Sequence, residues 1–348
     1  MAKSECSCKC GQKTSEWPGR VEGQLSPAPL ALGTNFTWRD VLGRWRVRWG
    51  IKRTDYQVAP GLYRVGQPDA GSAVLVTANY KLTVDEVRCQ LVGLHVWLLV
   101  LDTKGVNVWC AAGKGTFGTE ELVRRIHAVN LAEVVNHRDL VLPQLGATGV
   151  AAHEVKRACG FSVHYGPVRA QDIRAYLAAD MRATPAMRQV LFTWKDRLVV
   201  TPVEIAGTLK PLLGILAVLA TLDVLRHHRV TPHLAADIVP FLAAILTGGV
   251  LVPLLLPWLP FKYFALKGAV AGALPTLAVV ALLPMRITEA AGTAFLVVAI
   301  TSYMAMMFTG STTFTTLAGV RLEVRRALPL ILLSAGAGAI LRIAGAFI

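Results

Sequence analysis

Five apolar segments constrain the fold of this chain more than any other feature of its sequence. Each has about twenty residues, the length that a helix needs to cross the hydrocarbon core of a bilayer. They lie at residues 209–225, 237–257, 264–284, 290–309 and 327–347. Of the 36 basic and 22 acidic residues, only fourteen follow Leu209, and these lie near the segment ends. The sequence therefore predicts an all-α transmembrane domain of five helices over residues 209–348.

The basic residues between these segments predict an orientation. If the amino end lies inside, the inside loops carry five of them: Lys262, Lys267, Arg321, Arg325 and Arg326. The outside loops then carry three: Arg226, Arg229 and Arg286. Because inside loops are enriched in Lys and Arg, we expect a multi-pass protein of the cytoplasmic (inner) membrane with its N-terminal domain in the cytoplasm. Arg342 is close enough to the carboxyl end to snorkel outward.

The chain before these segments is typical of a soluble α/β protein. Residues 1–59 are polar and rich in Gly, Pro and Trp without sustained periodicity, which predicts an irregular, mobile segment. Residues 60–180 alternate short apolar runs with helical periodicity, which indicates a Rossmann-like α/β domain with a parallel sheet. Residues 181–208 are expected to form a basic linker.

Four apolar runs are the expected strands of that sheet: 73–77, 95–101, 139–142 and 161–164. Helices are expected at 83–93 and at 119–130, the second with Thr119 as its N-cap. A long loop is expected over 103–114. Ligands of open parallel sheets bind at the carboxyl ends of the strands. The loops after the four strands should therefore converge on one site.

Charge and cysteine usage exclude some classes of protein. The net charge is +14, but the basic residues are scattered or flank the apolar segments, so we expect no nucleic-acid partner. Six cysteines, at positions 6, 8, 10, 89, 110 and 159, form no disulfide framework, and no signal peptide opens the chain. The soluble part is therefore expected to stay in a reducing cytoplasm.

Cys110 lies among small residues in the expected loop, within the octet Asn107-Val108-Trp109-Cys110-Ala111-Ala112-Gly113-Lys114. Free cysteines are often buried structural residues, and composition alone favours that interpretation. The Ala-Ala-Gly run, however, would let a flat ligand approach the backbone, and Lys114 adds positive charge, which favours a thiolate. Composition and spacing leave both interpretations open.

The octet resembles the corrinoid-binding domain of HgcA-type proteins of mercury methylation. Three further segments carry the same resemblance: Thr77-Ala78-Asn79-Tyr80-Lys81-Leu82-Thr83, Leu142-Pro143-Gln144-Leu145-Gly146 and Tyr165-Gly166-Pro167. The membrane part, including 308–314, also resembles that family. More distantly, the soluble domain is similar to the large subunit of the corrinoid iron–sulfur protein of the acetyl-CoA pathway.

This resemblance implies a corrinoid (cobalamin) held base-off over a short cap helix, with the Cys110 thiolate as the lower, catalytic cobalt ligand. It implies a corrinoid-dependent methyltransferase that passes a methyl group to Hg(II) and forms methylmercury. The other cofactor-binding residues expected from it are Thr77, Asn79, Thr83, Asn107, Val108, Trp109, Ala111, Ala112, Gly113, Lys114, Gly146, Gly166 and Pro167. The histidine-ligating corrinoid motif Asp-x-His-x-x-Gly is absent from the sequence.

The chemistry requires partners. The cobalt must regain two electrons after each carbanion transfer, and the cysteines of this chain are not spaced for a cubane cluster. We expect a ferredoxin-like electron donor with two 4Fe–4S clusters, as the family has, and a methyl donor, either methylated folate or its protein carrier. Cys6, Cys8 and Cys10 could capture soft Hg(II), although a tail without a role is the better-supported interpretation.

Two alternatives stay open. One is a membrane-anchored corrinoid methyl carrier of one-carbon metabolism of the acetyl-CoA pathway type, because no acceptor pocket is visible in the sequence. The other is a transporter or binding protein whose five spans carry the function. It is the weaker alternative, because transport paths usually require ionisable residues away from the helix ends.

Overall fold

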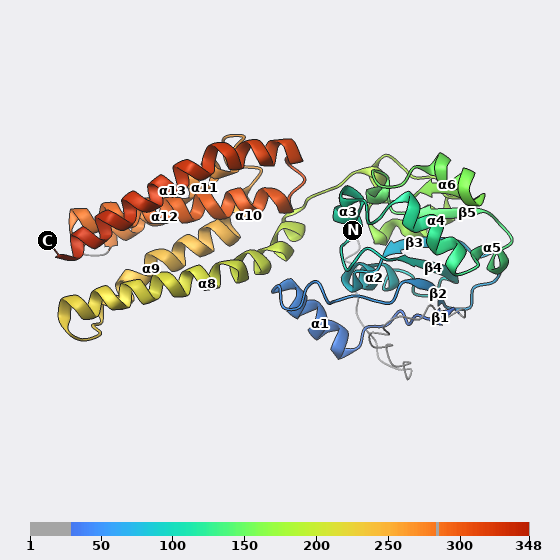
Figure 1. Ribbon diagram of the computed structural model, residues 1–348, viewed down its shortest axis with the longest axis horizontal. Helices are drawn as coiled ribbons and strands as arrows, with labels where there is room; N and C mark the ends of the chain where they lie inside the picture. Colours follow the sequence, from blue (N-terminus) through green and yellow to red (C-terminus); the bar gives the residue numbers. More distant parts are fainter. Residues whose placement is uncertain (1–28, 283–284, 348) are drawn as a thin grey trace. The chain divides into compact units, whose positions relative to one another are not determined.

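The computed structural model describes residues 29–282 and 285–347, in two compact units (Figure 1). The first unit contains the described residues up to Val47 and Ile51–Val190. The second contains Arg48–Gly50 and the described residues from Leu191 onward. Cys6, Cys8 and Cys10 lie outside the described residues.

A six-stranded sheet forms the centre of the first unit, in the order β1-β2-β4-β3-β5-β6. The strands are β1 (Leu30–Ala31), β2 (Gly61–Val65), β3 (Val74–Ala78), β4 (Val96–Leu101), β5 (Asp139–Leu142) and β6 (Ser162–Tyr165). β2 runs antiparallel to β4, and the other neighbouring pairs are parallel. Every residue of β3 and β4 is buried, as their continuous apolar sequences require of strands covered on both faces.

Helices cover both faces of this sheet. Those of the first unit are α1 (Trp38–Arg48), α2 (Lys81–Arg88), α3 (Val108–Lys114), α4 (Thr119–Ala128), α5 (Leu131–Val134), α6 (Ala152–Cys159) and α7 (Ile173–Ala178). Alternate residues of β3 point to opposite faces, so Val76 packs in one core with side chains of α3 to α6, and Leu75 packs in the other with side chains of α2 and α7. Short 3-10 turns lie at η1 (Gln144–Gly146), η2 (Ala170–Asp172) and η3 (Ala186–Arg188).

The expected α/β class is confirmed, and the four expected strands correspond to β3 to β6. The lead-in, expected to be irregular, contains β1 and α1, and the sheet gains an antiparallel member in β2. The expected loop at 103–114 was wrong, because α3 occupies its second half. Thr119 is not an N-cap either. Gly118 holds that position, and the Thr119 hydroxyl accepts the Ala151 N–H at 2.9 Å instead.

The second unit is helical, and its five expected long apolar helices are confirmed. It contains α8 (Trp194–His227), α9 (His233–Leu246), the π-helix η4 (Thr247–Leu251), α10 (Val252–Leu255), α11 (Phe264–Leu282), α12 (Ile287–Met307), the 3-10 turn η5 (Phe308–Ser311) and α13 (Leu317–Phe347). α8 begins within the stretch expected to be a basic linker. A capping box fixes that start, because the Thr193 hydroxyl and the Asp196 carboxylate each accept the other residue's backbone N–H.

Arg342 does not snorkel outward, which corrects the expectation from sequence. It is 7% exposed and forms ion pairs with Asp237 of α9 and with Glu289 of α12, the latter at 3.7 Å. Glu289 also pairs with Arg226 of α8 at 3.0 Å. A charge with partners on two neighbouring helices is cheaper to bury than an isolated one. The sequence could not show these partners, because they are distant along the chain.

Candidate functional site

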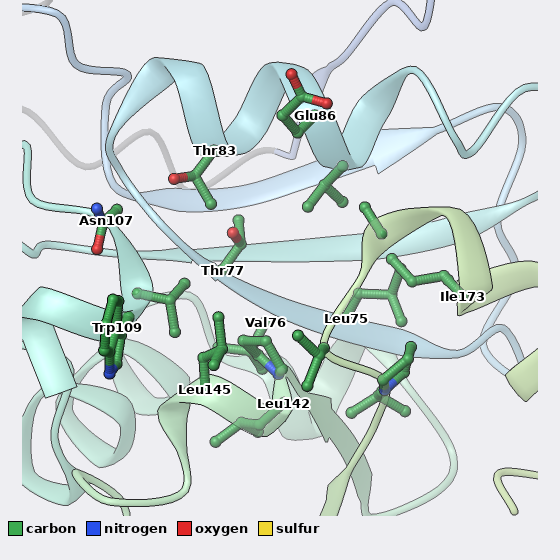
Figure 2. A pocket seen from close by; sticks show the side chains of 17 residues that line it. Leu75, Val76, Thr77, Thr83, Glu86, Asn107, Trp109, Leu142, Leu145 and Ile173 are labelled. Carbon is green, nitrogen blue, oxygen red and sulfur yellow. The ribbon is translucent and has the colours of Figure 1, made fainter. Parts of the chain in front are cut away.

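A cavity of about 300 Å³ lies at the carboxyl ends of β3 and β5 (Figure 2). In Figure 2, Thr83 and Glu86 of α2 lie on one side of it, and Leu142 and Leu145 lie on the other. The loops that follow β4, β5 and β6 contribute to the lining, whereas β3 contributes through the strand itself and not through its loop, Asn79–Tyr80. The expected convergence of four loops is therefore confirmed for three of them. The lining residues are Leu75, Val76, Thr77, Thr83, Glu86, Val87, Asn107, Val108, Trp109, Val141, Leu142, Pro143, Leu145, Pro167, Val168, Ala170 and Ile173.

Thr77 is the unusual residue of this lining. Its side chain is 2% exposed, and its hydroxyl has no hydrogen-bond partner among the described residues. A buried hydroxyl without a partner costs free energy, so such groups are uncommon in a finished core. At the wall of a cavity, this hydroxyl is available to hydrogen-bond a polar group of a ligand.

α3 presents Cys110 to solvent. Asn107 caps the helix, because its side-chain oxygen accepts the Cys110 backbone N–H at 2.9 Å. Val108, Ala111 and Ala112 are buried and Asn107 is half-buried, whereas the other four members of the octet are exposed: Trp109, Cys110, Gly113 and Lys114. The exposed thiol contradicts the interpretation of Cys110 as a buried structural residue.

Gly113 lies on the same exposed face, nearly one turn after Cys110. A Cβ added to it would have no heavy atom within 4 Å, so the space beside it is open. The exposed surface of α3 therefore carries the Cys110 thiol, Trp109 and Lys114, with bare backbone at Gly113. A broad, flat group can approach such a surface closely.

Asn79 fixes the loop before α3 through hydrogen bonds to its side chain. The side-chain oxygen of this buried residue accepts hydrogen bonds from the Thr103 N–H at 3.1 Å, the Thr103 hydroxyl at 2.9 Å and the Gly105 N–H at 3.0 Å. These three hydrogen bonds occupy the side-chain oxygen of Asn79. Asn79 is not among the residues that line the cavity.

Two of the expected glycines allow close packing near α3. A Cβ on Gly146 would lie 2.5 Å from the ring of Phe117, which is fully buried, and one on Gly166 would lie 3.0 Å from Val141. Neither glycine lines the cavity. Because neither glycine has a side chain, η1 can pack closely against Phe117 and the loop after β6 can pack closely against the sheet.

The structure brings six of the expected site residues together at the cavity: Thr77, Thr83, Asn107, Val108, Trp109 and Pro167. The others are not among the lining residues: Asn79, Cys110, Ala111, Ala112, Gly113, Lys114, Gly146 and Gly166. Eleven of the seventeen lining residues were not among the expected site residues, including Glu86 and Val87 of α2. Both follow Thr83 at the i+3 and i+4 spacing of one helix face, so this spacing was a usable signal.

A buried charge cluster fixes α2, which supplies these lining residues. Lys81 pairs with Asp40 at 2.6 Å and with Asp85 at 2.8 Å, and Arg88 pairs with the same two carboxylates at 2.9 and 2.8 Å. Burial alone would raise the pKa of Asp40. Hydrogen bonds from Lys81 and the Thr37 N–H, and the charges of Lys81 and Arg88, outweigh burial and hold that pKa well below its usual value.

The remaining described cysteines lie apart from the cavity lining. Cys89 is the C-cap of α2, and Cys159 ends α6 and packs partly against the core. In the part of the chain that the structure describes, no three His, Cys, Asp or Glu side chains are grouped to hold a metal ion.

Comparison with known proteins shows a similarity confined to part of the chain. Residues 48–177 match the family described as CO dehydrogenase/acetyl-CoA synthase delta subunit. This segment contains every residue of the cavity lining and ends before the five long helices.

Curated relatives are similar to about a third of the chain. The acetyl-CoA decarbonylase/synthase complex subunit gamma of Methanopyrus kandleri is 35% identical over 127 residues, which is 36% of this chain and 27% of that protein. The subunit gamma of Archaeoglobus fulgidus has the same identity and coverage. That of Methanocaldococcus jannaschii is 37% identical over 98 residues, 28% of this chain and 20% of that protein. The chain thus spans about a quarter of the length of these relatives.

Proposed function

We propose that this protein is a membrane-anchored corrinoid protein that carries methyl groups, of the acetyl-CoA decarbonylase/synthase type. The observation that carries the proposal is the similarity of residues 48–177 to subunits of that complex, over the segment that builds the cavity and α3. The five apolar helices supply the anchor. Of the two methyl-transfer functions expected from sequence, the comparisons favour this one over mercury methylation.

The residues at the site fit part of a corrinoid. A bound corrinoid supplies a cobalt ion that can accept a methyl group from a donor and release it to an acceptor. The cavity lies at the lower end of the 300–1,000 Å³ range of small-molecule pockets (about 300 Å³), so it suits the nucleotide tail, which Thr77 and Thr83 would hydrogen-bond. The exposed surface of α3 suits the flat ring.

Cys110 is the proposed lower ligand of the cobalt. The capping bond from Asn107 fixes the backbone at Cys110, and the bonds from Asn79 fix the loop that precedes the helix. The thiol is therefore presented from a short, braced helix with no bulky side chain at Gly113 to obstruct the ring. A sulfur ligand donates more electron density than imidazole does, which favours release of the methyl group to an electrophile.

Mercury methylation is the second candidate. The octet from Asn107 to Lys114 and its exposed cysteine favour it, because Hg(II) is a soft electrophile suited to a methyl group released as a carbanion equivalent. The comparisons supply no support for Hg(II) as the acceptor. Cys110 has the same proposed role in both functions, so the acceptor alone distinguishes them.

The proposed partners follow from this chemistry. A methylated folate or its protein carrier would donate the methyl group, and a ferredoxin-like protein with two 4Fe–4S clusters would donate electrons. The names of the relatives, which are subunits of a complex, support protein partners of this kind. The basic residues Lys262, before α11, and Arg325, in the first part of α13, support a cytoplasmic location for the corrinoid domain.

The test is purification of the full chain from a host supplied with corrinoid. We expect cobalt in about equal amount to protein and a corrinoid visible spectrum. A chain that folds but contains no corrinoid would contradict the proposal. To separate the two acceptors, the methylated protein is offered Hg(II) or the acceptors of the acetyl-CoA pathway. Transfer to Hg(II) alone would favour the second candidate.

A further inference from the structure

α1 carries its apolar side chains on its exposed face. These side chains recur at the i, i+3, i+4 and i+7 spacing of a single helix face: Trp38, Val41, Leu42 and Trp45. They are between 46% and 70% exposed. On the opposite face, Asp40 and Val47 are only 6% and 3% exposed. The helix is therefore apolar on the side that an ordinary surface helix keeps polar.

The inward face of α1 is held by charge. Asp40 belongs to the buried cluster with Lys81 and Arg88, and Arg44 forms an ion pair with Glu86 of α2. Hydrogen bonds between Thr37 and Asp40 close a capping box at the start of the helix. These contacts fix the rotation of α1 about its own axis, and this rotation leaves the apolar face exposed.

α4 of the same unit shows the ordinary arrangement. Its apolar residues Leu122 and Ile126 are buried, and its charged residues Glu120 and Arg124 are exposed. α4 thus directs its apolar side chains inward, whereas α1 of the same unit directs them outward.

Basic residues flank this face. Arg39 and Arg46 are exposed along one edge of it. The whole stretch from Trp38 to Arg53 has six basic residues: Arg39, Arg44, Arg46, Arg48, Lys52 and Arg53. Its one acidic residue, Asp40, is buried and paired. The exposed surface of this stretch thus combines tryptophan, aliphatic side chains and positive charge.

We propose that α1 is an interfacial membrane helix that lies on a bilayer surface bearing anionic lipids. Helices of this kind place an apolar face with Trp and Leu at the boundary between headgroups and acyl chains, and keep Lys and Arg among the headgroups. Tryptophan is enriched at that depth. The basic residues beside the apolar face favour a lipid surface as its partner, because anionic headgroups attract them. The five apolar helices of the chain are long enough to cross a membrane, which would place a bilayer near this domain.

This proposal is independent of the proposed function. The buried charge cluster connects the proposed membrane contact to the cavity. Asp40 of α1 pairs with Lys81 of α2, and Thr83 and Glu86 of α2 line the cavity. Binding of α1 to lipid therefore attaches the helix that borders the cavity to the membrane surface.

The experiment uses the full chain in vesicles that contain anionic lipid with bromine on the acyl chains, which quenches tryptophan at close range. The variant Trp38→Phe/Trp45→Phe should lose a quenched part of the emission. The control variant Trp97→Phe, which removes a buried tryptophan of β4, should lose an unquenched part. Equal quenched fractions in the wild type and the α1 variant would overturn the proposal.

A second pair of variants tests the apolar face without removing fluorophores. Val41→Asp/Leu42→Asp should weaken the bromolipid quenching of Trp38 and Trp45, whereas Val92→Asp, at an exposed apolar residue outside α1, should not. Vesicles of zwitterionic lipid should also give weaker quenching than anionic ones. If α1 is shielded from acrylamide in solution yet shows no bromolipid quenching, a protein covers the face and the lipid proposal is wrong.

Discussion

The unpaired hydroxyl of Thr77 distinguishes the cavity from the ordinary core at the scale of single residues. Thr103 is equally buried, but its hydroxyl donates to the Asn79 side chain or to the Val106 carbonyl, which lies 2.7 Å away. The two threonines therefore have different roles. The fold uses the hydroxyl of Thr103, whereas a ligand would use that of Thr77.

Thr77→Val should weaken corrinoid binding about two- to tenfold, the range that corresponds to one lost hydrogen bond. The stability of the corrinoid-free protein should be unchanged or higher, because the variant removes a buried polar group without a partner. Thr103→Val is the matched control and should destabilise the protein by about 1–3 kcal/mol. Corrinoid titration and thermal unfolding measure the two effects. Reduced stability of Thr77→Val with unchanged affinity would contradict this role.

Gly113 and Gly146 should respond differently to alanine. Gly113→Ala adds a methyl group in open space within a helix, so it should stabilise the corrinoid-free protein by up to about 1 kcal/mol and weaken corrinoid binding. Gly146→Ala places a Cβ against Phe117 and should destabilise the protein by about 1–3 kcal/mol. Thermal unfolding with and without corrinoid separates the two. Unchanged corrinoid affinity in Gly113→Ala would argue against a ring over α3.

The resemblance to corrinoid-binding proteins predicted part of this site. Thr77, Thr83 and Trp109 line the cavity as expected, whereas Cys110 is not among the lining residues. The structural role of Asn79 was not predictable, because its hydrogen-bond partner Thr103 is far along the chain.

At the scale of elements, α1 and α2 depend on the buried cluster of two acidic and two basic side chains. Asp40→Asn leaves Lys81 and Arg88 with one carboxylate fewer. It should therefore destabilise the packing of α1 against α2 by about 3–5 kcal/mol. Relative to the wild type, the full-length variant should show faster amide hydrogen exchange in α1 and α2, with a smaller change in α4. Equal protection in the variant and the wild type would contradict this coupling.

The same cluster predicts a dependence on pH. The pKa of Asp40 is lowered in the folded protein relative to the unfolded value of about 3.9. The stabilisation from this group is therefore present at neutral pH and is lost as the pH falls below about 4 toward the folded pKa. Asp40→Asn should remove this part of the acid sensitivity. An acid-unfolding profile that is unchanged in the variant would exclude Asp40 as its source.

Long elements were predictable and short ones were not. β3 and β4 are continuous apolar runs, and the sequence located both. α3 has seven residues, too few for a periodic pattern, although Asn107 was a readable N-cap. α1 was missed although Trp38, Val41, Leu42 and Trp45 recur at helical spacing, which was a usable signal. Its outward apolar face was not predictable, because the ion-pair partners of Asp40 and Arg44 are distant along the chain.

At the scale of the whole molecule, the boundary between the two units lies between Val190 and Leu191. A fragment that ends at Val190 should fold alone, remain soluble and bind corrinoid, because it contains the sheet and the whole cavity lining. A fragment that ends at residue 208 retains a severed α8 and should be less soluble. Size-exclusion chromatography and corrinoid titration compare them. Aggregation of the shorter fragment with corrinoid present would contradict its independence.

Hydropathy alone predicted the five long helices, but not the ion pairs of Arg342.

The spectrum of the bound cobalt tests the central claim most directly. The full chain is loaded with corrinoid and compared with Cys110→Ala and with Cys159→Ser, a control cysteine at the end of α6. We predict visible and electron paramagnetic spectra of a base-off corrinoid with sulfur ligation in the wild type and in Cys159→Ser, and loss of the sulfur signature in Cys110→Ala. Nitrogen ligation in the wild type, or unchanged spectra in Cys110→Ala, would contradict the account.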